Sequence, residues 1–268
     1  MDAMNKPELI PFRNGRFNQN IAGKIKIMEE TLEKTIGQMV AEDYRTAQVF
    51  KNHKIDFCCK GNRSLEEVAE KNKLDIAVLL KEIAEVRTEK TDDHTDFKSW
   101  PLDLLADYIE KKHHRYVEER IPVLRQYLTK LCKVHGNHHP ELLKIQEHFD
   151  LSAGELTMHM KKEELVLFPW IRKMVKSEQK NESPGAPHFG TVRNPIQAMM
   201  QEHENEGERF RQIAKLSDDY TPPEDACSTY RVSFSLLREF EEDLHRHIHL
   251  ENNILFPKAE VLESELNA

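Results

Sequence analysis

The residues with the most evident chemistry are a histidine and a glutamate that recur together at a fixed spacing. His159 and Glu163 are four residues apart, as are His247 and Glu251, and after three intervening residues each chain segment reads Leu-Phe-Pro. On a helix, residues four apart lie on the same face, one turn above the other. The imidazole and the carboxylate of each pair can therefore bind one ligand together, and a metal cation suits both groups.

Both pairs lie on apolar helix faces. The apolar neighbours on these faces are Ile145, Phe149, Leu156, Val166 and Trp170 for the first pair and Leu237, Phe240, Leu244 and Ile254 for the second. An ionised carboxylate in an apolar core is costly unless it is paired or coordinated. Because the chain places two such carboxylates at matched positions, we expect them to bind metal.

Further histidines are expected at the same level. His203 lies on an apolar face 44 residues before His247. His113 and His114 both continue an apolar face, and periodicity alone does not decide between them. His114 lies 45 residues before His159, a separation that matches the 44 residues between His203 and His247 and predicts a second hairpin of the same size. Four imidazoles and two carboxylates suit a pair of first-row metal ions, each held by two histidines and both spanned by the glutamates, with iron as the natural candidate.

Long helices are needed to hold these side chains, and the sequence predicts four. Apolar residues recur at helical spacing near residues 102–133, 139–176, 194–216 and 224–253. The strongest loop signal, Ser177 to Asn194, divides them into two pairs, which predicts an antiparallel four-helix bundle. Pro122 is expected to kink the first helix without ending it. The histidine-rich ligand set, with His before Glu, favours a hemerythrin-like bundle over the carboxylate-rich ferritin-like kind.

A smaller helical domain is expected before the bundle. Apolar spacing predicts a short helix from about Val40 that runs into a turn at Phe57, a second that opens at the Ser64 and Glu67 capping box, and a third capped by Asp75. The polar stretches on either side lack this periodicity. We therefore predict an N-terminal extension at 1–30, a small helical domain with vicinal cysteines at 31–88, a linker at 89–101 and the bundle at 102–262.

The vicinal cysteines of this small domain are Cys58 and Cys59. Lys60 and Arg63 follow them, and nearby cations favour the thiolate, which is the form that binds metals and exchanges disulfides. A pair of small buried side chains is the alternative interpretation. The other two cysteines of the chain look like isolated thiols.

Several neighbouring side chains are set apart from the ligands. His135 lies at the expected hairpin apex, too far along the helix to join the metal centre. His245 and His249 are expected on a solvated face. Glu155 and Glu202 are candidates for a supporting shell around the ligands, with an exposed position as an equal alternative.

Composition narrows the class of protein. The 268 residues include 39 Lys and Arg against 47 Asp and Glu, a net charge of −8, which disfavours nucleic acid as a partner. The nine glycines form no phosphate-binding motif. Neither a signal peptide nor an apolar run of about 18 residues can be read, so no membrane association is expected. Four scattered cysteines fit a cytoplasmic protein.

Over about residues 35–260 the chain resembles the Repair of Iron Centres family. The resemblance is carried by Asp56-Phe57-Cys58-Cys59 with Gly61, by His113-His114 ahead of Ile121-Pro122, by Glu202-His203, and by Leu250-Glu251-Asn252-Asn253 with the Leu-Phe-Pro that follows. It implies His114 as the first-helix ligand. The implied ligand set is His114, His159, Glu163, His203, His247 and Glu251. The family also implies an oxo- or hydroxo-bridged di-iron centre in a hemerythrin-like domain.

The function implied by this resemblance is repair of iron-sulfur clusters damaged by nitric oxide or peroxide, through donation of iron. Cys58 and Cys59 would assist the transfer or a redox step. Damaged or apo iron-sulfur proteins would be the partners, and a homodimer is a family-based expectation. We favour a non-catalytic iron donor over two alternatives, a hemerythrin-like oxygen-binding or oxygen-sensing module and a di-iron nitric oxide or peroxide reductase. Paired thiols argue against a plain oxygen carrier.

Overall fold

A computed structural model of the chain describes residues 34–88 and 95–268. Within these ranges the regular structure is helical, apart from one isolated bridge between Thr35 and Ser64. The predicted all-α class is therefore confirmed. The predicted extension at 1–30, and residues 89–94 of the predicted linker, lie outside the described residues.

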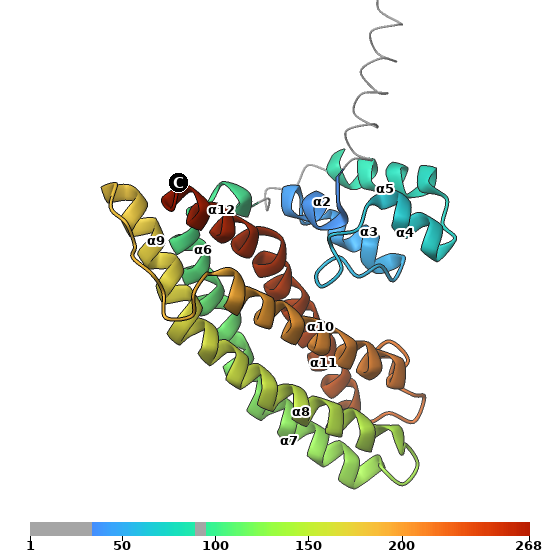
Figure 1. Cartoon of the computed structure of the whole chain (residues 1–268). Coiled ribbons are helices and arrows are strands. Elements are labelled where there is room, and N and C mark those ends of the chain that lie inside the picture. Colours follow the sequence, from blue (N-terminus) through green and yellow to red (C-terminus); the bar gives the residue numbers. More distant parts are fainter. Residues whose placement is uncertain (1–33, 89–94) are drawn as a thin grey trace, which may run out of the picture.

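Residues 34–88 form a small helical domain (Figure 1). Its helices are α2 (Ile36–Glu42), α3 (Thr46–Asn52), α4 (Leu65–Asn72) and α5 (Ile76–Thr88). The predicted capping box of Ser64 and Glu67 opens α4, and the Asp75 carboxylate accepts a hydrogen bond from the N–H of Ala77 at 2.9 Å as α5 begins. These side chains satisfy N–H groups that have no partner within the helix.

The helix predicted from Val40 is in fact two helices, α2 and α3. They are separated at Asp43, whose backbone is extended at φ −151° and ψ 101°. The Asp43 carboxylate accepts hydrogen bonds from the backbone N–H of Arg45 at 3.1 Å and from its guanidinium at 2.6 Å. An aspartate that binds the chain two residues on forms a local turn, and this turn redirects the chain where apolar spacing alone predicts continuity.

Residues 102–266 form the predicted bundle of four long helical segments (Figure 1). The first consists of α6 (Leu102–Tyr108), the π-helical segment η2 (Ile109–His114) and α7 (Arg115–His135), and it continues past Pro122. The other segments are α8 (Glu141–Lys162), η3 (Glu163–Leu167) and α9 (Phe168–Lys180), then α10 (Arg193–Leu216), and finally α11 (Ser228–Leu250), η4 (Glu251–Leu255) and α12 (Phe256–Leu266). Helix α8 packs between α7 and α10, and α11 contacts both α7 and α10, which closes the bundle.

The described end of the predicted linker packs on the bundle. It contains the short 3-10 helix η1 (Phe97–Ser99), and the ring of Phe97 lies 5.1 Å from the ring of Tyr108 on α6. Lys258 on α12 donates to the backbone carbonyl of Trp100 at 2.9 Å. Residues 97–100 therefore fasten the entry of the bundle to its last helix.

The apolar core is divided along the length of the bundle. One cluster of buried side chains, which includes Phe149 and Phe240, extends from α7, α8 and α11 into the small domain. A second cluster fills the end built from α6, α9 and α12. On α10, Met199 belongs to the second cluster and Phe210 to the first, and His203 lies between them. The predicted ligands thus form a polar layer between two apolar cores.

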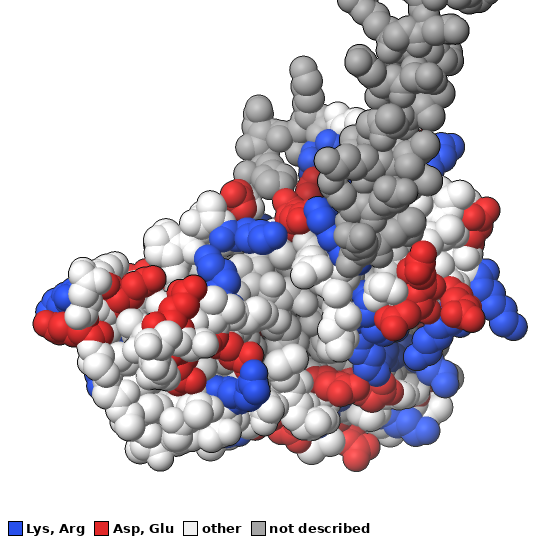
Figure 2. Space-filling model, turned by 45° about the horizontal axis from the view of Figure 1, so that its top comes forward, with Lys and Arg blue, Asp and Glu red and all other residues white. Residues whose placement is uncertain are grey.

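The surface carries both signs of charge. Figure 2 shows one face, on which the described Lys and Arg side chains lie interspersed with Asp and Glu. In the part of the chain that the structure describes, no helix combines the length and the apolar character needed to cross a bilayer.

Candidate metal centre

The six predicted ligands meet in the polar layer, and none is more than 2% exposed. Their donor atoms form two groups, each with all atoms within 4.8 Å of one another. One group is His114, Glu163, His247 and Glu251, and the other is His159, Glu163, His203 and Glu251. Both glutamates belong to both groups. The arrangement therefore offers two adjacent cation positions, each with two imidazoles and both spanned by two carboxylates.

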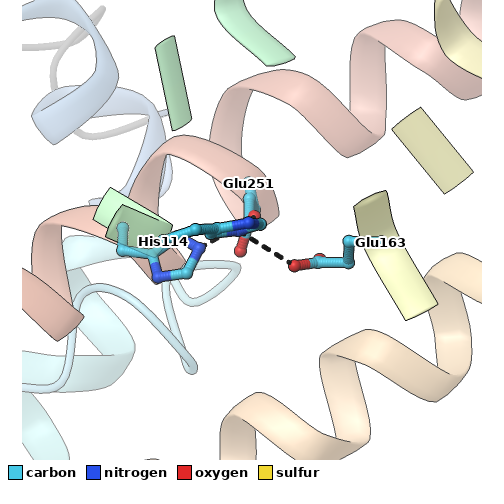
Figure 3. A group of neighbouring side chains, drawn as sticks. His114, Glu163 and Glu251 are labelled. Carbon is cyan, nitrogen blue, oxygen red and sulfur yellow. Dashed lines mark hydrogen bonds and ion pairs between the residues drawn. The ribbon is translucent and has the colours of Figure 1, made fainter. Parts of the chain in front are cut away.

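The first group is partly shown in Figure 3, where His114, Glu163 and Glu251 point toward one another. Nε2 of His114 lies 3.4 Å from Oε2 of Glu163 and 4.0 Å from Oε1 of Glu251. Nε2 of His247 is 3.0 Å from the same Glu251 oxygen. Side chains from three of the four long segments thus converge on one point.

The second group is closely spaced as well. The Nε2 atoms of His159 and His203 are 3.0 Å apart, and these atoms lie 3.3 Å from Glu163 and 3.2 Å from Glu251, respectively. Two nitrogen ligands that each lie about 2.1 Å from one cation, at a right angle, are about 3.0 Å apart. The two imidazoles are therefore spaced as ligands of a single ion.

Atoms without a hydrogen-bond partner test whether a cation fits. Among the described residues, both carboxylate oxygens of Glu163, Oε2 of Glu251 and Nε2 of His114 are buried without a hydrogen bond. Buried ionised groups are costly unless they are paired or coordinated. A donor set of imidazoles and carboxylates suits a first-row transition metal. The residues present therefore fit a pair of such cations.

Neighbouring charges favour the ionised forms of Glu163, Glu251 and His159. Burial raises the pKa of Glu163 and of Glu251, but the charges of neighbouring histidines, chiefly His159 and His247, outweigh it and hold both pKa values below the usual range. Burial lowers the pKa of His159, but Glu163 and then Glu202 raise it to about 10. A cation that binds here must displace the proton of His159, so its binding is coupled to proton release.

Helix geometry widens at the predicted glutamate ligands. The N–H of Phe168 donates to the carbonyl of Glu163, and that of Phe256 to the carbonyl of Glu251, five residues back rather than four. The proline of each Leu-Phe-Pro follows at once, and because proline has no N–H, a regular helical bond is lost there in any case. The first segment also has a π-helical stretch, which ends at His114. The repeated motif was a signal for these turns that the sequence analysis did not use.

Three of the predicted histidine ligands have their outward nitrogen held by a neighbour. Nδ1 of His159 lies 2.9 Å from Glu202, Nδ1 of His114 lies 3.1 Å from Glu164, and Nδ1 of His203 lies 2.8 Å from Asn252. An acceptor at Nδ1 fixes the tautomer that leaves Nε2 free for a cation. Glu202 was predicted as a supporting residue, whereas Glu164 and Asn252 were not. Each of these directly follows a predicted glutamate ligand, which was the available signal.

His113 and Glu155 lie outside the two groups. Nδ1 of His113 is 3.0 Å from Asp243, and its ring stacks on that of His247 with centroids 5.6 Å apart. His113 therefore packs against a predicted ligand, and His114 joins the groups. The Glu155 side chain is 56% exposed and pairs with Arg209, so it does not support the predicted ligands directly.

The prediction that His245 and His249 face solvent is wrong for His249, which the small domain covers, whereas the side chain of His245 is 20% exposed. His249 is 1% exposed, and its ring lies 5.7 Å from Tyr44 and 6.0 Å from Phe57. Burial lowers the pKa of His245 to about 4 and that of His249 to about 3. Helical periodicity cannot reveal a cover that comes from about two hundred residues earlier in the chain.

Cys58 and Cys59 lie where the small domain meets the bundle. Sγ of Cys59 is 3.3 Å from the carbonyl oxygen of His203, and the Asn252 amide donates to the carbonyl of Cys58 at 3.2 Å. Asn252 also contacts the imidazole of His203. One side chain therefore connects the cysteine loop with a predicted ligand.

The expected thiolate at Cys58 is not favoured. The hydrogen bond with Cys59 and burial raise the pKa of the Cys58 thiol well above its usual value. Lys60 instead pairs with Glu204 at 3.1 Å, and Arg63 donates to backbone carbonyls, including that of Asp56 at 3.0 Å. Lys60 and Arg63 thus interact with groups other than the thiols. Their closeness in the sequence does not predict these partners.

His135 lies at the far end of the bundle, as predicted. Its Nε2 is 3.2 Å from Sγ of Cys227, so this cysteine is not the isolated thiol that was expected. The thiol of Cys132 donates to the carbonyl of Leu142 at 3.3 Å.

A four-helix bundle whose core joins histidines from all four segments through two shared glutamates defines the hemerythrin class of cation-binding protein. The family of the hemerythrin HHE cation binding domain matches residues 105–259, and ScdA_N, a domain of unknown function (DUF542), matches residues 32–87. The chain is 33% identical to the iron-sulfur cluster repair protein YtfE of Musicola paradisiaca, over 85% of this chain and 96% of the relative. It is 31% identical to the iron-sulfur cluster repair protein ScdA of Staphylococcus haemolyticus, over 85% and 98%. It is 33% identical to YtfE of Yersinia pseudotuberculosis, over 84% and 96%. The chain therefore belongs to the family of iron-sulfur cluster repair proteins.

Proposed function

We propose that this protein repairs damaged iron-sulfur clusters by donating iron from an oxo- or hydroxo-bridged di-iron centre in its bundle. The observation that carries the proposal is the pair of donor groups that share Glu163 and Glu251. Support also comes from the relatives, which are named iron-sulfur cluster repair proteins. His114 and His247 would hold one iron, and His159 and His203 the other. The bound iron pair would supply the ions that a damaged cluster has lost.

The residues favour release of iron over permanent storage. Each position has two imidazoles and a share of two carboxylates, which leaves coordination sites open on an ion that prefers six ligands. Protons compete for the same imidazoles, because Glu163 and Glu202 also stabilise the protonated form of His159. Without metal, the imidazoles and carboxylates of the polar layer lie within ion-pair distance of one another, which lowers the cost of losing the iron.

The partners we propose are damaged or apo iron-sulfur proteins in the cytoplasm. The acidic surface residues and the partly exposed Asp56, Cys59 and Lys60 are the features of the chain that such a partner would meet. We propose no catalytic residue, since donation needs binding and release and no bond-breaking step by a side chain.

Repair of a defined cluster tests the proposal. Iron-loaded protein is mixed, without oxygen and with a reductant, with a [4Fe-4S] hydratase inactivated by peroxide, and hydratase activity and iron bound to each protein are measured. We expect activity to return as iron leaves the donor in proportion. Glu163→Gln, which preserves shape and removes one shared carboxylate, should lose both iron and repair, whereas His135→Ala, at the far end of the bundle, should retain them.

The same assay separates the alternatives. Many turnovers of nitric oxide or peroxide per iron pair, with no iron leaving, would identify a reductase and refute donation. Full iron content in Glu163→Gln would refute the assignment of the centre.

A further inference from the structure

A second cluster of metal-binding side chains lies in the small domain. We propose that Asp56, Cys58 and Cys59 form a separate site for one divalent transition-metal ion, at the boundary with the bundle. One carboxylate oxygen and the two sulfur atoms lie within 4.8 Å of one another. Carboxylate and thiolate donors differ from the imidazole-rich set of the bundle, and two thiolates select softer, lower-coordinate ions.

The spacing of these atoms matches a four-coordinate ion. The two sulfur atoms are 3.6 Å apart, and Sγ of Cys58 lies 3.5 Å from Oδ1 of Asp56. Metal–sulfur bonds of about 2.3 Å and a metal–oxygen bond of about 2.1 Å at tetrahedral angles place two sulfurs about 3.8 Å apart and sulfur and oxygen about 3.6 Å apart. The donor atoms therefore need only small shifts to bind one ion.

The backbone and neighbouring cations hold the loop in this shape. Oδ1 of Asp56 accepts a hydrogen bond from the N–H of Cys59 at 2.9 Å, and its Oδ2 accepts one from Arg211 at 2.9 Å. Gly61 closes the loop, and a Cβ there would lie 2.4 Å from the carbonyl oxygen of Phe57. The three donors are thus positioned by contacts that do not depend on a metal.

Binding at this site exchanges protons for the ion. The Cys58 thiol is protonated in the metal-free protein, because its hydrogen bond with Cys59 and burial raise its pKa. A divalent ion that binds both sulfurs displaces the Cys58 proton and leaves two thiolate ligands, with the Asp56 carboxylate as the third ligand. Three protein ligands leave a fourth position open, as in sites where a ligand or substrate is exchanged.

The location suggests what the site is for. Cys59 contacts the backbone of His203, one of the predicted ligands of the centre, while Asp56 and Cys59 are only partly buried. An ion held here lies between the centre and the solvent. Transient binding of iron that leaves the centre would be a role of this site that rests on the proposed function. The existence of the site does not depend on that function.

Cobalt(II) is a direct probe, because bonds between cobalt and thiolates absorb strongly in the near ultraviolet. Full-length protein with its bundle centre already filled with iron is titrated with cobalt, without oxygen and with a reductant that contains no thiol. We expect one cobalt ion per chain, and thiolate absorption and proton release that both saturate at that ratio.

Matched variants identify the ligands. Asp56→Asn keeps an oxygen that accepts the Cys59 N–H and removes the charge, so the loop is preserved while cobalt affinity should fall at least about tenfold. Cys59→Ser should lose most of the thiolate absorption. Cys227→Ser removes the thiol that lies beside His135, and it should leave the titration unchanged.

The outcomes decide between the two proposals. Absence of thiolate absorption, or absorption lost in Cys227→Ser and kept in Cys59→Ser, overturns the second site. Thermal unfolding of each variant shows whether it folds. If a variant at the buried Cys58 fails to fold, Asp56→Asn and Cys59→Ser are sufficient to test the ligands. Cobalt binding without any repair of the damaged hydratase would leave the site standing and refute the proposed function instead.

Discussion

Asn252 is the side chain whose replacement tests the link between the centre and the cysteine loop. Its amide oxygen lies 2.8 Å from Nδ1 of His203, and its amide nitrogen donates to the carbonyl of Cys58 at 3.2 Å. The two partners fix the amide orientation, because the opposite orientation would set donor against donor and acceptor against acceptor. Asn252 therefore orients the imidazole and holds the cysteine loop at the same time.

The Asn252→Ala change removes both contacts. Loss of a partner behind a metal ligand typically weakens metal binding about 10- to 100-fold, or about 1.4 to 2.8 kcal/mol. His203 belongs to only one of the two donor groups, so we expect one of the two iron ions, the one shared with His159, to be released faster. Asn252→Asp keeps an acceptor for His203 and loses the donor to Cys58, so it should retain iron and loosen the loop.

Iron release to a ferrous chelator and hydrogen exchange at residues 56–61 measure the two effects separately. Asn253→Ala is the matched control, because Asn253 donates to the carbonyl of Phe57 at 3.2 Å and contacts His249 instead of His203. We expect two phases of iron release in Asn252→Ala and one phase in Asn252→Asp and Asn253→Ala. Hydrogen exchange at residues 56–61 should be faster in all three variants. Identical iron release in Asn252→Ala and the parent protein would refute the reasoning.

Three further predictions concern stability. Glu163→Gln removes the carboxylate that lies 3.4 Å from His114 and 3.3 Å from His159 and leaves buried imidazoles without their ion-pair partner, so the metal-free protein should lose about 3 to 5 kcal/mol in urea unfolding; a gain would contradict this. The pKa of His159 is raised from 6.5 to about 10 by its carboxylate neighbours, so its contribution to metal-free stability is full below pH 6.5 and is lost as the pH rises to about 10. Urea midpoints across that interval check the sign, and a rising midpoint would count against it. Gly61→Ala places a Cβ 2.4 Å from a carbonyl oxygen and should lower the unfolding temperature, whereas Gly154→Ala, with open space around its Cβ, should stabilise helix α8 by about 0.5 to 1 kcal/mol.

The sequence predicted the bundle because its helices obey a simple period. Apolar faces located the long segments, and the repeated His and Glu spacing pointed to the polar layer between the two cores. Periodicity left His113 and His114 unresolved, because adjacent residues on a helix can both border one apolar face. Packing separates them: His114 faces Glu163, while His113 faces Asp243.

What the sequence could not predict comes from contacts between distant segments. Burial of His249 depends on Tyr44 and Phe57 of the small domain, and the raised pKa of Cys58 depends on a covered loop. The predicted exposure of His249 and the predicted thiolate at Cys58 were each inferred from neighbours in the sequence alone, without the segments that pack on them. Asn252 was part of a recognised motif, yet its role became visible only with Cys58 and His203 on either side of it.

The two donor groups are matched in sequence but differ in what stands behind them. His114 and His159 each have a carboxylate at Nδ1, from Glu164 and Glu202. A carboxylate partner makes an imidazole a stronger ligand than a neutral amide does, because it stabilises positive charge on the ring. His203 has the neutral Asn252, which the small domain also holds, and Nδ1 of His247 has no hydrogen-bond partner among the described residues.

This asymmetry predicts which ion responds to the small domain. Movement of the cysteine loop away from the bundle would take the Cys58 carbonyl from Asn252 and free its amide to rotate away from His203. The first group has no such connection, since the partner of His114 lies on the bundle itself. Loss of the contact between Asn252 and Cys58 should therefore affect the iron held by His159 and His203 before the other.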